Sequence, residues 1–299
     1  MQCKIKYQRE YDKALLFTID KLPCEFSEKL KSFLEKNNIY TVNEIRIRAS
    51  SFVCLMLNGK SLKTDIFVSE NEIEKIVLHL CDGSIYAHLS TIKEGYISVG
   101  KGIRAGICGK AVITNGEIDG IYDISSVCIR IPQKIKHAGE FLFDYLKRHE
   151  FRRSVILYSP PGAGKTTVLR DLTLRISTEQ IRCSVIDTRE EITTFLEASL
   201  SCDVFLSYPK STAIEMATRT LTPQIILCDE ITSLKEAEAI KHSVNSGVSL
   251  VATTHASSFD ELSSKEILKG LFACGAFDTA IGISRGHNNK FIFEVNDIK

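Results

Sequence analysis

Residues 154–167 read S-V-I-L-Y-S-P-P-G-A-G-K-T-T, and this stretch decides the fold. Its first residues form a short apolar run typical of a buried strand, and a helical pattern, T-V-L-R-D-L-T-L-R-I, begins at Thr167. Gly162 and Gly164 give the connecting loop enough backbone freedom to turn its N–H groups toward phosphate oxygens. A loop of this kind between a strand and a helix predicts a phosphate-binding P-loop.

The predicted nucleotide-binding segment is continuous in the sequence. Its members are Ser159, Pro160, Pro161, Gly162, Ala163, Gly164, Lys165, Thr166 and Thr167. We expect Lys165 to reach the β- and γ-phosphates of ATP, and the Thr166 hydroxyl to ligate Mg²⁺. Ser159 stands where the motif G-x-x-x-x-G-K-[ST] has its first glycine, a position that eases a turn and makes no phosphate contact.

A second apolar run, Ile225–Glu230, ends in two acidic residues. Together with a P-loop, this pattern is typical of a Walker B strand. We expect Asp229 to hold Mg²⁺ through its water shell, and Glu230 to orient and deprotonate the attacking water. Without the P-loop, the two acids would read as solvated residues at the start of a loop.

Two further strand ends carry polar residues, and each leaves two interpretations open. The run 249–255 ends in Thr254 and His255, which could sense the γ-phosphate or could simply occupy a turn. The run ending at Asp187 continues through Glu190 and Glu191, which could support the attacking water or the metal. The alternative for this acidic cluster is a solvated loop with local ion pairs.

Arg219 precedes the Walker B strand and is a candidate for sensing nucleotide at an interface. Glu215 lies four residues earlier, so the pattern fits an ordinary ion pair along one helix equally well. The residues alone favour the helix pair slightly.

The two halves of the chain show different patterns. Before residue 136, amphipathic helices and short strands with a strong Asn58-Gly59 turn signal indicate a smaller α+β domain. From residue 151, strands that are apolar throughout alternate with helices, which predicts an α/β domain with a largely parallel sheet covered on both faces. We therefore expect domains at 1–136 and 151–299, joined by a linker helix at 137–150.

One motif in the first half is misleading. The stretch from Gly100 to Ala105 matches the glycine pattern of a dinucleotide-binding loop, and a strand-like run precedes it. The residues that follow are interrupted by Gly106 and Gly109 and continue as β-type sequence rather than as a helix. We therefore reject a dinucleotide site.

Composition excludes several classes of protein. The chain has 299 residues with 38 basic and 37 acidic side chains, so its net charge of +1 argues against a nucleic-acid partner. None of its 10 cysteines forms a C-x-x-C pair, and we expect reduced thiols in a cytosolic protein. The amino-terminal sequence resembles no signal peptide, and no apolar run approaches the roughly 18 residues that span a bilayer.

Four segments of the second half resemble, in their order, the motifs of the RecA-like secretion ATPase superfamily. They are the P-loop (162–167), an acidic box (187–191), the Walker B strand (225–230) and a histidine box (253–256). The chain is more similar still to the stage III sporulation protein AA family. The stretches that carry this resemblance are NEIRIR (43–48), GYISVGKGIRAGICGKAV (95–112), SPPGAGKTTVLRDL (159–172), VIDTREEI (185–192), RTLTPQIILCDEI (219–231) and ATTHASS (252–258).

The resemblance implies a RecA-like P-loop ATPase core and a hexameric ring with ATP at the subunit interfaces. It also implies an integral-membrane partner from an export apparatus, and a location on the mother-cell side of the forespore membrane. Arg104, Arg130 and Arg219 become candidates to reach nucleotide within or across subunits. Two other interpretations stay open, namely a nucleic-acid-dependent ATPase and a regulatory module that binds nucleotide without turnover. Glu230 argues against the second of these, because a pure binder needs no acid to activate water.

Overall fold

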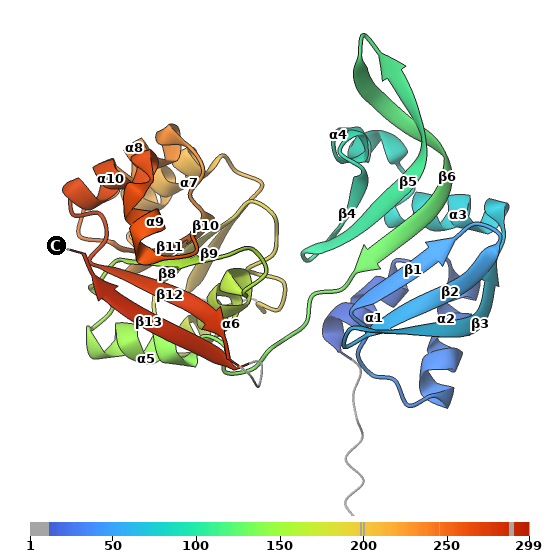
Figure 1. Ribbon diagram of the computed structural model, residues 1–299, viewed down its shortest axis with the longest axis horizontal. Coiled ribbons are helices and arrows are strands. Elements are labelled where there is room, and N and C mark those ends of the chain that lie inside the picture. The colour runs from blue at the N-terminus through green and yellow to red at the C-terminus, as the bar shows by residue number, and fades with distance from the viewer. Residues whose placement is uncertain (1–11, 198, 200, 245, 287–289, 299) are drawn as a thin grey trace, which may run out of the picture. The chain divides into compact units, whose positions relative to one another are not determined.

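The computed structural model describes residues 12–197, 199, 201–244, 246–286 and 290–298. The chain divides into two compact units, Met1–Gln133 and Lys134–Lys299 (Figure 1). The segment 137–150 contains the helix α5 (Glu140–Arg148), which lies inside the second unit.

The first unit is built on a six-stranded antiparallel sheet with the order β3-β2-β1-β6-β5-β4. Its strands are β1 (Glu44–Arg48), β2 (Ser51–Leu57), β3 (Lys60–Val68), β4 (Tyr96–Gly100), β5 (Ile103–Thr114) and β6 (Glu117–Arg130). Its helices are α1 (Lys13–Asp20), α2 (Cys24–Lys36), α3 (Glu70–Leu80), the 3₁₀ turn η1 (Ile85–His88) and α4 (Leu89–Lys93).

Local sequence signals explain several of these elements. Ile45 and Ile47 are fully buried while their neighbours in β1 are more exposed, so this strand has one covered face. Asn58 and Gly59 both adopt positive φ, 49° and 81°, in the tight turn between β2 and β3. Ser69 caps α3 in a reciprocal capping box with Glu72.

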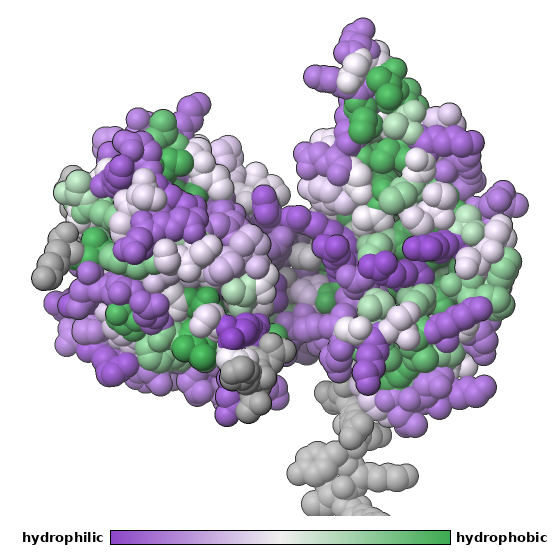
Figure 2. Space-filling model, in the orientation of Figure 1, coloured by the Kyte–Doolittle hydropathy of each residue, from purple (hydrophilic) through white to green (hydrophobic). Residues whose placement is uncertain are grey.

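The glycine-rich region forms hairpins rather than a nucleotide loop. Gly100 and Ala105 lie on the paired strands β4 and β5, with no strand-to-helix turn between them, so rejecting the dinucleotide site was correct. Near its turn, between residues 110 and 122, the hairpin of β5 and β6 carries exposed apolar side chains that are visible in Figure 2. These include Val112, Ile113, Ile118 and Tyr122.

The second unit contains a seven-stranded sheet with the order β13-β12-β7-β11-β10-β8-β9. Its strands are β7 (Val155–Ser159), β8 (Cys183–Asp187), β9 (Cys202–Leu206), β10 (Ile225–Glu230), β11 (Ser249–His255), β12 (Thr279–Arg285) and β13 (Phe291–Asp297). Its other helices are α6 (Lys165–Thr178), α7 (Lys210–Met216), the π-helical turn η2 (Ala217–Leu221), α8 (Leu234–Val244), α9 (Phe259–Ser264) and α10 (Glu266–Ala273).

This sheet is parallel except for β13, and both of its faces are covered. Val155 and Leu157 of β7 pack in one core cluster with residues of α5 and α6. Ile156 and Tyr158, which point the other way, pack in a second cluster with residues of α7, α8 and α10. The sequence prediction of a largely parallel sheet between two helical layers is therefore confirmed.

The topology places the predicted motifs side by side. Strand β11 lies between β7 and β10 and runs parallel to both, so the carboxyl ends of all three strands meet at one edge of the sheet. The P-loop, Glu230 and His255 follow these ends. No helix among the described residues combines the length and apolarity needed to cross a membrane.

Candidate functional site

The P-loop connects β7 to α6 with the geometry that its glycines allow. Gly162 and Gly164 have φ of 78° and 111°, in the left-handed region that favours glycine. Gly164 is also crowded, because a Cβ atom there would lie 2.8 Å from Cε1 of Phe291 and 2.9 Å from Nη2 of Arg285. Arg285 donates from Nε to the carbonyl oxygen of Ala163 at 3.1 Å. The β12–β13 hairpin therefore packs directly on this loop.

Lys165 begins α6, and its side chain is only 7% exposed. Its Nζ donates to the carbonyl oxygen of Ser159 at 2.9 Å and to the Ser159 hydroxyl at 3.1 Å. Burial lowers the pKa of Lys165, against the attraction of Glu230. Ser159, which stands at the first glycine of the motif, thus holds the ammonium group in place.

His255 joins the P-loop to the Walker B strand. Its Nδ1 lies 2.9 Å from Nζ of Lys165, and its Nε2 lies 3.4 Å from Oε2 of Glu230. Because an ammonium group can only donate, Nδ1 accepts and the proton of a neutral ring sits on Nε2, facing Glu230. The sequence left His255 open between a site residue and a turn residue, and the structure places it within the site.

Asp229 is paired with a lysine that the sequence analysis missed. Nζ of Lys210 lies 2.7 Å from Oδ1 of Asp229, and Lys210 also donates to the backbone carbonyl of Glu230. Burial raises the pKa of Asp229, and the attraction of Lys210 offsets part of this rise. For Lys210, burial is the largest single effect and lowers the pKa, but the combined effects of its acidic neighbours, led by Asp229, outweigh burial and the net shift is upward. No motif marks Lys210 in the sequence.

Asp187 organises the acidic loop that follows β8. Its fully buried carboxylate accepts the backbone N–H groups of Glu191, Ile192 and Thr193 at 3.0, 2.9 and 2.8 Å, and also the Thr193 hydroxyl at 2.8 Å. These four hydrogen bonds give Asp187 a structural task. Glu190 lies at the bend of the same loop with φ of 57°.

The candidate arginines lie in separate places. Arg219 is exposed in the π-helical turn η2, and no ion pair joins its described side chain to that of Glu215. Arg104 and Arg130 belong to the first unit, where Arg104 lies over the ring of Tyr96 at 5.1 Å.

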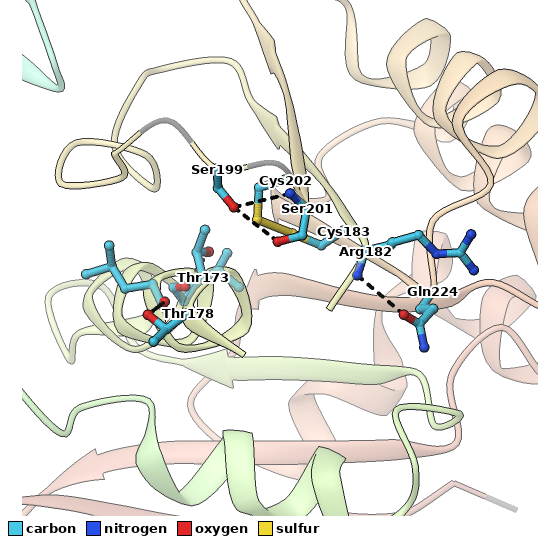
Figure 3. The surroundings of a disulfide bond; sticks show 10 residues. Thr173, Thr178, Arg182, Cys183, Ser199, Ser201, Cys202 and Gln224 are labelled. Atoms are coloured by element: carbon cyan, nitrogen blue, oxygen red, sulfur yellow. Dashed lines mark hydrogen bonds between the residues drawn. A yellow bond between two sulfur atoms is a disulfide. The ribbon is translucent and has the colours of Figure 1, made fainter. Parts of the chain in front are cut away.

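The prediction that all cysteines are reduced is wrong for one pair. Cys183 and Cys202 form a disulfide between the first residues of β8 and β9 (Figure 3). These residues are register partners on adjacent strands, with Cα atoms 4.9 Å apart, and their separation of 19 in the sequence hides this proximity. The bond joins the amino ends of the strands, whereas Asp187 lies at the carboxyl end of β8. The seven other cysteines of the described chain are free.

The residues present fit a magnesium ion. Oδ1 of Asp229 is one of two buried side-chain polar atoms in the described part of the chain that have no hydrogen-bond partner, and its contact with Lys210 is an ion pair. Oδ2 already accepts the Thr188 hydroxyl at 3.3 Å. The described residues contain no group of three or more His, Cys, Asp or Glu side chains that could hold a metal.

Comparison with solved structures shows the fold. The ATPase DotB of Legionella pneumophila superposes with a TM-score of 0.60 at 15% identity, covering 93% of this chain and 82% of that one. The pilus retraction motor PilT, solved with bound ADP, gives a TM-score of 0.62 at 14% identity, covering 91% of this chain and 82% of that one. The chain thus has the mixed α/β fold of DotB and PilT.

Sequence comparison shows the family. Stage III sporulation protein AA of Bacillus subtilis (strain 168) is 28% identical over 267 residues, which cover 86% of this chain and 87% of that protein. The family model described as "Sporulation stage III, protein AA" matches residues 22–295. The chain therefore belongs to the stage III sporulation protein AA family.

Proposed function

We propose that this protein is a Mg²⁺-dependent ATPase that powers a membrane-associated export apparatus during endospore formation. Membership in a sporulation family and the fold shared with secretion and pilus ATPases support the proposal. The observation that carries it is the chain of contacts from Lys165 through His255 to Glu230, at the adjoining ends of three parallel strands.

In this proposal the P-loop, from Ser159 to Thr167, surrounds the phosphates of ATP. Lys165 transfers its hydrogen bonds from Ser159 and His255 to the β- and γ-phosphate oxygens. Thr166 and Asp229 hold Mg²⁺, which neutralises charge on the phosphates when bound.

Glu230 is the proposed general base. Its carboxylate orients the attacking water and accepts a proton from it. His255, with its Nε2 proton directed at Glu230, fixes the orientation of that carboxylate and senses whether Lys165 has moved to the phosphates. Glu190 is proposed to support the water from the acidic loop, and Arg219 to reach nucleotide from an exposed turn at a subunit interface.

We further propose that the protein works as a hexameric ring. The ring would dock on an integral-membrane protein of the export apparatus, at the cytoplasmic surface on the mother-cell side. The division into an N-terminal domain, a linker helix at 137–150 and an ATPase domain belongs to the same proposal. The resemblance to ring-forming secretion ATPases supports this assembly.

Phosphate release from ATP by the purified protein tests the enzymatic proposal. The assay is run with and without single-stranded DNA, and Lys165→Ala serves as the blank. Turnover that exceeds the blank and is indifferent to DNA supports the export motor. Strong stimulation by DNA would instead favour a nucleic-acid-dependent ATPase.

A further inference from the structure

Lys210 is a buried cation inside the candidate site, although no sequence motif contains it. It is the first residue of α7, and its side chain is 11% exposed. Its ammonium group contacts both acidic residues at the end of β10, through Oδ1 of Asp229 and the backbone carbonyl of Glu230. Burying an ammonium group is costly without a partner, so this position implies a specific task.

The contacts of Asp229 show what that task involves. Its Oδ2 accepts the Thr188 hydroxyl at 3.3 Å, whereas Oδ1 has no hydrogen-bond partner among the described residues and is the better placed to serve a metal. That same oxygen lies 2.7 Å from Nζ of Lys210. Lys210 therefore occupies the oxygen that would accept a hydrogen bond from the water shell of Mg²⁺, and the two cations would also repel each other at low dielectric.

Acidic residues surround the ion pair of Asp229 and Lys210 and favour a cation beside Asp229. Asp187 and Glu236 are close enough to act electrostatically on the pair, and both are acidic. On the other side, Glu230 faces His255 and Lys165. Lys210 is the cation paired directly with Asp229, and it compensates the charge of that carboxylate when no metal is bound.

We propose that Lys210 is a built-in counterion that holds Asp229 before Mg²⁺ arrives and gives way to Mg²⁺ when ATP binds. This inference rests on the proposed ATPase function. Lys210 is the first residue of α7. Its release on Mg²⁺ binding would therefore loosen the first turn of that helix. Lys210 is thus a positioning residue for Asp229, and it competes with the metal.

Binding of ATP to the intact protein, by calorimetry with EDTA and then with Mg²⁺, tests the proposal. The quantity compared is the Kd for ATP in EDTA divided by the Kd for ATP in Mg²⁺. Lys210→Met should raise this ratio by about tenfold or more, because ATP without metal loses a nearby cation while Mg²⁺ loses its competitor. Lys210→Arg, which keeps the charge, and Lys235→Met, which removes an exposed lysine of α8, should leave the ratio near that of the parent.

The outcomes separate this inference from the proposed function. If the parent binds no more ATP than Lys165→Ala does, the proposed function fails. If the parent binds ATP and Lys210→Met leaves the ratio unchanged, or Lys210→Arg shifts it equally, the counterion role is overturned and the ATPase proposal stands.

A measurement on the parent alone covers the case in which Lys210→Met does not fold. Backbone hydrogen exchange of residues 208–214 is compared with a non-hydrolysable ATP analogue at saturation, in EDTA and in Mg²⁺. Release of Lys210 should make exchange faster in Mg²⁺. Equal exchange in the two conditions would overturn the proposal.

Discussion

Nζ of Lys165 and Nδ1 of His255 lie 2.9 Å apart, although 90 residues separate them in the sequence. The contact exists because β7 and β11 are neighbours in the sheet and pair in register up to Ser159 and His255. The side chain of Lys165 is therefore held in place by His255, the last residue of the adjacent strand β11. Substitutions at Lys165, His255 and Glu230 should therefore affect ATP binding and turnover in different ways.

Replacing Lys165 by alanine should abolish ATP binding and hydrolysis, because the phosphate charge loses its partner. The measurement is ATP affinity by calorimetry together with phosphate release. Lys269→Ala, which removes an exposed lysine, is the matched control and should behave like the parent. Near-normal turnover by Lys165→Ala would contradict the P-loop assignment.

Replacing Glu230 by glutamine should leave ATP binding intact and slow turnover at least about a hundredfold, the scale expected for losing a general base. Single-turnover phosphate release, with ATP affinity measured in parallel, separates the two effects. If Glu230→Gln hydrolyses ATP at the parent rate, the base lies elsewhere. Glu190→Gln and Glu191→Gln would then be the next variants to measure.

Replacing His255 by alanine tests the middle of the contact chain. Without the imidazole, Glu230 loses the group that orients it, so kcat should fall by roughly tenfold or more. ATP affinity should hold or increase, because Lys165 no longer gives up a contact with His255 to reach the phosphates. A rise in KM with unchanged kcat would show instead that His255 acts in uniform binding of substrate.

Much of this site could be predicted from the sequence because its signals are local. A glycine-rich loop between an apolar strand and a helix determines the P-loop, and an apolar strand ending in two acids determines the position of Glu230. Strands that are apolar throughout also indicated the two-sided parallel sheet. In each case, a few neighbouring residues carry the physical requirement.

The remaining features depend on contacts between distant segments. Lys210 gains its role only because α7 starts beside the end of β10, and no pattern around Lys210 reveals this. The disulfide arises from the register of β8 and β9, which sequence spacing does not disclose. The edge strands β9 and β13 were not predicted, since most of their residues are exposed or half-buried and neither strand is apolar throughout.

Replacing Gly164 by alanine should weaken ATP binding by about tenfold, because a side chain is strained at φ of 111° and would also collide with Phe291. Gly162→Ala is the matched control, since φ there is also positive but no atom lies within 4 Å of the added Cβ. Calorimetry should therefore show a smaller loss for Gly162→Ala than for Gly164→Ala.

Removing the Phe291 ring isolates the collision from the backbone strain. The double variant Gly164→Ala with Phe291→Ala should recover part of the affinity that Gly164→Ala alone loses, because the collision with the Phe291 ring is removed while the backbone strain stays. If Gly162→Ala and Gly164→Ala lose affinity equally, and removing Phe291 restores nothing, the packing of the β12–β13 hairpin on the P-loop does not matter for binding.

Reducing the bond between Cys183 and Cys202 should lower the free energy of unfolding of the second unit by about 3 kcal/mol. The reason is that the cross-link restricts the unfolded chain between two residues 19 apart in the sequence. Urea unfolding curves with and without dithiothreitol measure the difference as a shift of the midpoint.

The variant Cys202→Ser should unfold at the same urea concentration in both conditions, as the reduced parent does. Cys24→Ser, which removes an exposed free thiol, should keep the parent's dependence on reductant. The prediction is contradicted if the unfolding midpoint of the parent is the same with and without dithiothreitol and if Cys202 can be alkylated in the native protein before reduction. Those two results together would show that the two thiols stay unbonded in solution.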